Sequence, residues 1–290
     1  SHVMKQIFLF FLLLNFSFNL IGQNINSPSI PAAGITMEFD QIDDTISISS
    51  IGPWDFSSIV PTSNYSMSVL PIDSSIHSNT YVNATHVLKS LNGEFFFAYT
   101  ANEFLSYGKV GNTTTTNYNT PLLLMNYPFS SNVSHTDSII STVLWNSLTA
   151  PLTEKIEVLG IATGTIIMPD GNSYQDAVLL STKKTTVNGP DPIFGNYLTV
   201  EEISKQFWLP GYPIPSIEVL HAYSNSSLVL KRTLFMKGNT TTNLTEPILN
   251  DQKKIVKKID LLGRETKITK NIPVFYIYDD GTVEKKIIIE

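Results

Sequence analysis

The chain has 290 residues, of which 42% are hydrophobic and 11% aromatic, and its net charge is −6. This length allows one large domain, or one domain with a small appendage, to bury a core of its own. The chain contains no cysteine, which excludes disulfides, thiolate metal sites and cysteine nucleophiles. From Pro247 to Glu290 there are nine Lys/Arg against seven Asp/Glu, so the rest of the chain is acidic, and an acidic body argues against binding to nucleic acid.

The chain begins with an apolar segment. Three residues, Ser1 to Val3, precede Met4 and resemble the remnant of an expression tag. One positive residue, Lys5, then leads into an apolar run from Ile7 to Ile21 and the small residue Gly22. This arrangement is typical of a secretory signal peptide, and we expect residues 1–23 to be removed on export. The run is too short for a membrane anchor and contains two asparagines, so we expect no membrane span after signal removal.

Residues 24–238 are expected to form an all-β body. Apolar and polar residues alternate over many short runs, and turn residues separate these runs. The clearest hairpin has Asn92-Gly93 as a type I′ turn, with both residues at positive φ. Two further hairpins are expected at residues 156–187, turning at 169–172, and at residues 217–236, turning at Asn225-Ser226. Sequential hairpins predict an antiparallel meander that forms a strongly curled sheet or a partly open barrel, with a β-sandwich as the alternative.

Several phrases of the body carry a resemblance. WDFSS (54–58), PLLLMNYPF (121–129), GTIIMPDG (164–171) and FWLPGYP (207–213) are similar to phrases of uncharacterised secreted proteins of Bacteroidota. Some of these relatives resemble the curved, half-open sheets of lipoprotein carriers. The resemblance therefore favours a curled sheet over a sandwich.

The C-terminal part is expected to form a separate small β-hairpin unit. Residues 239–252 are polar, contain a proline and are expected to be a linker. Residues 253–290 contain an alternating strand at 273–278, the turn Asp279-Asp280-Gly281, and a returning strand at 283–289.

This segment resembles the C-terminal sorting domain of cargo for the type IX secretion system, in a shortened, type A-like form. The resemblance rests on KIDLLGRE (258–265), FYIYDDG (275–281) and KKIII (285–289), whereas the opening Pro-Asn-Pro phrase of the family is replaced by EPILN (246–250). It implies that the outer-membrane translocon is a partner, and that the protein is secreted or held on the outer surface; the periplasm is the alternative location. The sorting residues that it implies are Asp260, Gly263, Arg264, Glu265, Asp280, Gly281, Lys285 and Lys286.

The body contains no sequence motif that assigns a catalytic residue, a cofactor or a metal. Acidic clusters at residues 38–44 and 201–202 could serve a glycosidase or Ca²⁺, or could form a solvated edge. Trp208 and Tyr212, in the Pro-rich phrase at 207–215, and Trp54 are candidates to stack on a ligand, with core packing as the alternative.

We therefore expect a binding or structural module of unknown ligand rather than an enzyme, and a glycan and an apolar molecule are the candidate ligands. The alternatives are a secreted polysaccharide-active hydrolase and a carrier of an apolar ligand. Exposed rings on a flat face would favour the first, paired acids in a cleft the second, and an apolar hollow of about 300–1,000 Å³ the third.

Overall fold

The computed structural model describes residues 24–145, 148–190, 195–238, 255–259, 266, 274–278 and 283–286. These residues fall into two compact units, the first with strands β1 to β13 and the second with strands β14 to β16. The predicted signal peptide and linker lie outside the described residues.

The first unit consists almost entirely of strands. Its one described helical element is the short 3₁₀ turn η1 (Ile72–Ser74). The strands are β1 (Ile35–Ile42), β2 (Trp54–Asp55), β3 (Ser63–Pro71), β4 (His86–Ser90), β5 (Gly93–Tyr99), β6 (Glu103–Val110), β7 (Thr114–Asn126), β8 (Ser134–Trp145), β9 (Leu148–Ile167), β10 (Ser173–Asn188), β11 (Leu198–Trp208), β12 (Ile217–Ser224) and β13 (Ser227–Met236).

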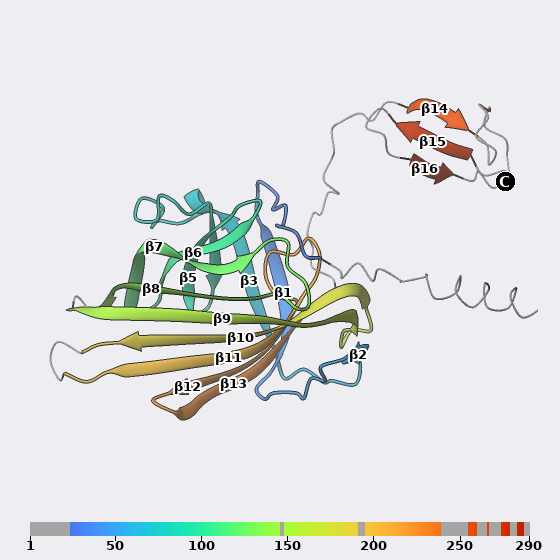
Figure 1. The fold of residues 1–290 in the computed structure, drawn as a ribbon. Coiled ribbons are helices and arrows are strands. Elements are labelled where there is room, and N and C mark those ends of the chain that lie inside the picture. The colour runs from blue at the N-terminus through green and yellow to red at the C-terminus, as the bar shows by residue number, and fades with distance from the viewer. Residues whose placement is uncertain are drawn as a thin grey trace, which may run out of the picture. The chain divides into compact units, whose positions relative to one another are not determined.

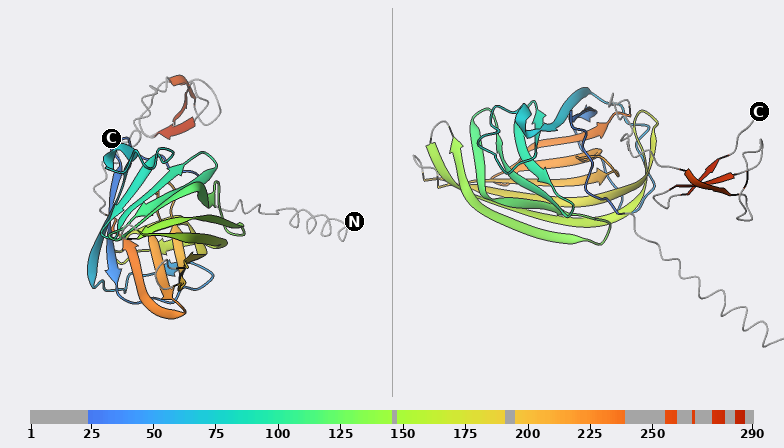
Figure 2. Two further views of the ribbon diagram at one scale, coloured as in Figure 1. Left: turned by 90° about the vertical axis from the view of Figure 1, so that its left-hand side faces the viewer. Right: turned by 90° about the horizontal axis from the view of Figure 1, so that it is seen from above.

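Twelve of these strands form a closed antiparallel barrel, in which each strand pairs with the next along the chain. The last strand, β13, pairs with the first, β1, where Phe39 lies opposite Met236, and β2 adds a short parallel pairing to the end of β9. Figures 1 and 2 show strands β1 and β3 to β8 curving over one side and β9 to β13 running across the other. The predicted curled meander is confirmed, and closure pairs the first and last strands, which would otherwise be the two free edges of the sheet.

The three predicted hairpins are present, with one difference in detail. Asn225 and Ser226 both have positive φ between β12 and β13, as a type I′ turn requires.

In the first hairpin, Ser90 pairs with Gly93, so Leu91 and Asn92 form the turn. The prediction of positive φ at both Asn92 and Gly93 is wrong, because Gly93 alone has it and begins β5. A Cβ there would lie 2.2 Å from the Val110 carbonyl oxygen, so the close approach of β6 requires glycine.

Two loop segments cover the outside of the barrel. The segment between β1 and β3 places Trp54 and Phe56 against outward-facing Phe207 of β11, with ring centroids 4.8 and 5.8 Å away. The segment between β3 and β4 stacks Tyr81 on Phe96 of β5 at 3.7 Å. Both faces of the wall are therefore packed at these places.

The second unit is a three-stranded antiparallel sheet in the order β14 (Ile255–Ile259), β15 (Val274–Tyr278), β16 (Val283–Lys286). Strand β15 pairs with β16 from Val274–Lys286 to Ile277–Val283, as the predicted hairpin requires. The amide of Thr266 donates to the carbonyl of Lys258 in β14. The expected small C-terminal β unit is thus present.

Candidate ligand-binding site

The inner face of the barrel is apolar along part of its length and charged along another part. From Ala150 to Val158 of β9, five buried residues alternate with more exposed ones, as expected of a wall with two faces. Four of these buried residues are apolar, and the fifth is a carboxylic acid. They are Ala150, Leu152, Glu154, Ile156 and Val158.

Aromatic side chains and the loop after β11 fill the apolar part. Trp208 packs edge-on against Phe129 at 5.5 Å and against Phe104 at 6.3 Å. The loop that follows Trp208 folds against the same core, where Ile214 is buried and the Tyr99 hydroxyl donates to the Pro213 carbonyl at 2.5 Å. This region is a packed core.

The mouth cavity, of about 490 Å³, lies at the end of the barrel where β7, β9 and β11 begin and β8 and β10 end, and it reaches Asn225 between β12 and β13. The rings of Trp145 and Tyr197 lie half-exposed on its lining, at 50% and 59% exposure. Its described lining comprises Thr113, Thr114, Val143, Trp145, Ala150, Asn188, Gly189, Asn196, Tyr197, Leu198 and Asn225. The cavity thus combines aromatic rings, aliphatic wall and neutral amides, in the size range of small-molecule sites.

One polar atom in this cavity has no partner. The side-chain oxygen Oδ1 of Asn188 is buried, and it accepts no hydrogen bond within the described chain. Buried polar atoms are nearly always paired, since leaving one unpaired costs about 1–3 kcal/mol. Asn188 Oδ1 is therefore an acceptor placed for a donor that the described protein does not supply.

A buried ionic cluster lies deeper in the barrel. Glu154 is fully buried, and its carboxylate accepts from Lys184 Nζ at 2.9 Å, from the Thr186 hydroxyl at 2.9 Å and from the Tyr118 hydroxyl. It is four residues along β9 from Ala150 of the mouth, or about 13 Å at strand geometry. On β10 the cluster extends to Thr186, two residues from Asn188 of the cavity lining.

The pKa values of the cluster follow from these charges. Burial opposes the charged form of Glu154, but Lys184 and Lys109 outweigh it, with the hydrogen bonds from Lys184 and Thr186, so the pKa of Glu154 is lowered. The positive charge of Lys184, together with burial, lowers the pKa of Lys109. The carboxylate of Glu154 is thus the anchor for two ammonium groups that repel one another.

The structure does not bring the three predicted ligand-binding aromatics together. Trp54 lies outside the wall, 4% exposed, with its Nε1 donating to the Ser49 carbonyl. Trp208 lies inside, 3% exposed, with its Nε1 donating to Gln206 Oε1 at 3.2 Å. Tyr212 is half-buried in the loop after β11, where burial raises its pKa.

Sequence reasoning missed the two rings at the mouth. Trp145 is the last residue of β8, an alternating strand, and Tyr197 directly precedes β11. An aromatic residue at a hairpin tip has fewer neighbours to bury it than one in mid-strand. That position was the available signal.

The acidic clusters lie mainly on the outer surface as ion pairs. Asp40 pairs with Lys237 at 2.9 Å, Asp44 with Lys231 at 2.8 Å and Glu201 with Lys183 at 2.7 Å. Among the described residues, no group of three His, Asp or Glu side chains is placed to hold a metal ion.

Of the predicted sorting residues, Lys285 and Lys286 lie in β16, opposite Phe275 and Val274. The other six, Asp260, Gly263, Arg264, Glu265, Asp280 and Gly281, lie outside the described residues.

No family model, curated protein or solved structure matches the chain. In the described ranges, no helix has the length and apolar character needed to cross a membrane.

Proposed function

We propose that the barrel is a binding module that takes a neutral sugar residue of a glycan into the mouth cavity. The observation that carries this proposal is the buried, unpartnered Oδ1 of Asn188, a residue that lines the same cavity as the half-exposed ring of Trp145. A sugar hydroxyl would supply the missing donor, while the apolar face of the sugar would lie against an aromatic ring.

The charge of the cavity supports a neutral ligand. Every described lining side chain is uncharged at neutral pH, and the amides of Asn196 and Asn225 provide further donors and acceptors. A charged ligand would lose its hydration there without gaining an ion pair from this lining.

Calorimetric titration of the whole protein with neutral oligosaccharides of two to six hexose units tests this proposal. We expect saturable binding, and we expect Trp145→Ala to weaken it by about tenfold or more, since stacking area would be lost. Asn188→Leu should weaken it similarly, because the acceptor is removed while the branched shape and the number of side-chain heavy atoms are kept. Leu144→Ala is the matched control: Leu144 precedes Trp145, is also half-exposed and does not line the cavity. Binding that is unchanged in both mouth variants would refute this site.

The apolar part of the lining supports a second candidate, a carrier of an apolar ligand. Val143, Ala150 and Leu198 form an aliphatic wall in a cavity of suitable size. The neutral dye N-phenyl-1-naphthylamine distinguishes the two candidates. Dye binding that Trp145→Ala abolishes, without any oligosaccharide binding, would favour the carrier.

We further propose that the second unit delivers the protein through the type IX secretion system to the medium or the outer surface. Its support is the sequence resemblance, together with a separate antiparallel sheet in which Lys285 and Lys286 form part of the last described strand. The full chain and a chain lacking residues 253–290 would be produced in a Bacteroidota host, with and without a functional translocon. Surface or medium signal should require both the segment and the translocon. Equal periplasmic retention in all four combinations would contradict the proposal.

A further inference from the structure

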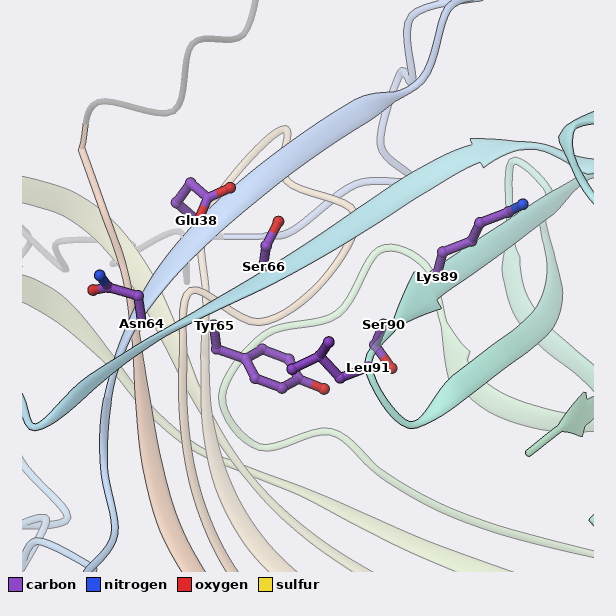
Figure 3. Close-up of a pocket in the computed structure, with 7 residues that line it drawn as sticks. All are labelled: Glu38, Asn64, Tyr65, Ser66, Lys89, Ser90 and Leu91. Carbon is purple, nitrogen blue, oxygen red and sulfur yellow. The ribbon is translucent and has the colours of Figure 1, made fainter. Parts of the chain in front are cut away.

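The barrel wall has a gap on its side, between β3 and β4. These strands pair only from Ser68–Lys89 to Pro71–His86, whereas β3 continues back to Ser63, paired with β1 alone. An outer notch of about 390 Å³ lies at this divergence, and Figure 3 shows Tyr65 and Leu91 between β3 and the end of β4.

The notch adjoins a pocket of about 200 Å³ on the inner side of the wall. Tyr65 and Ser90 line both hollows, so the two share a boundary. The inner pocket is mostly apolar, with a small polar set at one place. Its lining comprises Phe39, Tyr65, Met67, Leu88, Ser90, Asn92, Phe95, Ile214, Pro215, Glu218, Arg232 and Leu234.

Arg232 is the one basic side chain in the described lining of this inner pocket, and its hydrogen-bonding capacity is only partly used. Its Nη2 donates to Glu218 Oε2 at 3.2 Å, and its guanidinium carbon lies 5.6 Å from the centre of the Tyr65 ring. Its Nε is buried and donates to no acceptor within the described chain. A buried N–H of a charged group left without an acceptor is costly, so an added acceptor at this guanidinium would be favourable.

We propose that this side pocket binds a small apolar carboxylic acid, whose carboxylate accepts hydrogen bonds from the guanidinium of Arg232. The planar guanidinium matches a carboxylate in shape and charge, and it can donate two parallel N–H bonds to it. The carbon skeleton of the acid lies against the apolar lining, where Phe39, Met67 and Leu234 are contributed by three strands. The small volume limits the ligand to a short chain or a single ring.

Glu218 is the resident competitor for the guanidinium. Burial raises the pKa of its carboxyl, the nearby Glu202 raises it further, and Arg232 and Gln206 act against both. The single contact to Arg232 at 3.2 Å is long for an ion pair, and the Glu218 carboxyl also accepts from Gln206 Nε2 at 3.3 Å. A ligand acid can therefore share or replace this contact.

Titration of the whole protein with hexanoate, followed by calorimetry, tests the proposal, and 1-hexanol is the neutral analogue. We expect hexanoate to saturate the site with a Kd of about 1 mM or below, and 1-hexanol to bind at least about tenfold more weakly. Arg232→Lys should weaken hexanoate binding by about tenfold, because the positive charge is kept but the fork is lost. Lys231→Met is the matched control: Lys231 is the preceding residue, and it pairs with Asp44 instead of lining the pocket.

Two further variants keep the test decisive if Arg232→Lys disturbs folding. Glu218→Gln should strengthen hexanoate binding by about threefold or more, since the competing carboxylate is removed. Arg232→Met combined with Glu218→Gln leaves no unpaired charge and should abolish binding. Absence of hexanoate binding at about 10 mM, equal binding of 1-hexanol, or binding that survives the double substitution would each overturn the proposal. Trp145→Ala should leave hexanoate binding unchanged, which separates this site from the mouth cavity.

Discussion

Glu154 shows how far one residue can depart from the pattern of its strand. It occupies an inward position of β9 between Leu152 and Ile156, where the alternation calls for an apolar side chain. Its cost of burial is offset by Lys184, Thr186 and Tyr118, which come from two other strands. Because these partners are distant in the sequence, the alternation alone could not identify the cluster.

We predict that Glu154→Gln destabilises the barrel by about 3–5 kcal/mol, because two ammonium groups then lose their shared counter-charge inside the wall. Urea unfolding followed by circular dichroism measures this. Glu157→Gln is the control, since Glu157 pairs with Lys155 on the outer face and its loss should leave the free energy of unfolding unchanged. Equal stability of Glu154→Gln and the parent protein would show that the cluster adds nothing.

Glu154 also makes the free energy of unfolding depend on pH. The pKa of Glu154 is lowered in the folded state from its usual value near 4.5, so the folded protein holds the charged form more strongly than the unfolded chain does. Its contribution is present above pH 4.5 and is lost as the pH falls through the folded value. The stability difference between the parent protein and Glu154→Gln should therefore shrink below about pH 4.5. Unfolding at a series of pH values measures it, and a constant difference would contradict the assignment.

Composition and residue type were a limited guide to which aromatics meet solvent. Trp54 and Trp208 were candidates because they lie in distinctive phrases, yet one packs outside the wall and the other inside it. Neighbours distant in the sequence bury both, Phe207 for Trp54 and Phe104 and Phe129 for Trp208, and a linear pattern does not specify such neighbours. The strand-end position of Trp145, in contrast, was visible in the sequence.

At the scale of elements, the pairing between β7 and β8 is the shortest between neighbouring strands of the barrel. These strands pair only from Thr114–Trp145 to Thr116–Val143. Further along, Asp137 of β8 accepts from the Leu123 amide at 2.7 Å and so bridges the separation. A side chain thus replaces a missing backbone contact.

Removing that bridge should loosen the pairing of β7 and β8 locally. We predict that Asp137→Ala speeds hydrogen exchange of the Leu123 amide by about tenfold or more, since a charge-assisted hydrogen bond is lost. Ser138→Ala, on the exposed face of the same strand, should leave the exchange rate as it is. Residue-resolved exchange by NMR decides between these outcomes, and no change at Leu123 in Asp137→Ala would show that the bridge is dispensable.

Strand β6 depends on glycine at one position. Gly108 has a φ of +129°, and a Cβ there would lie 2.1 Å from the Thr116 carbonyl oxygen and 3.1 Å from Tyr81. We predict that Gly108→Ala destabilises the fold by roughly 3 kcal/mol or more, because the β7 backbone cannot yield. Gly171→Ala controls for backbone conformation alone: its φ is +82°, it has open space, and it should cost about 1–2 kcal/mol. Thermal unfolding compares them, and equal losses would remove the steric argument.

The sequence predicted the hairpins well, since turn residues and alternation are local signals. It did not predict closure, which requires β1 and β13 to meet, or the exact turn at Leu91-Asn92, which the approach of β6 to Gly93 determines. Long-range pairing of this kind leaves no local pattern.

At the scale of the whole barrel, closure joins residues about 200 positions apart, since Phe39 pairs with Met236. Such contacts are costly to form in an unfolded chain, because the intervening loop must first be ordered. We predict refolding in milliseconds to seconds or longer, measured by stopped-flow fluorescence after dilution from urea. Microsecond refolding would imply that closure is not part of the rate-limiting step.

Two adjacent lysines of β10 show how insertions and deletions would affect a wall made of a single layer of strands. Lys183 faces outward and pairs with Glu201, whereas Lys184 faces inward and pairs with Glu154. Because facing alternates at each step, inserting a single residue early in β10 would exchange the two environments along the rest of the strand, whereas inserting two would restore them. A substitution in the wall changes the environment of one side chain, whereas an insertion of an odd number of residues reverses the facing of every later residue in the strand. Variants of this barrel should therefore gain or lose residues at hairpin tips, or in pairs within the wall.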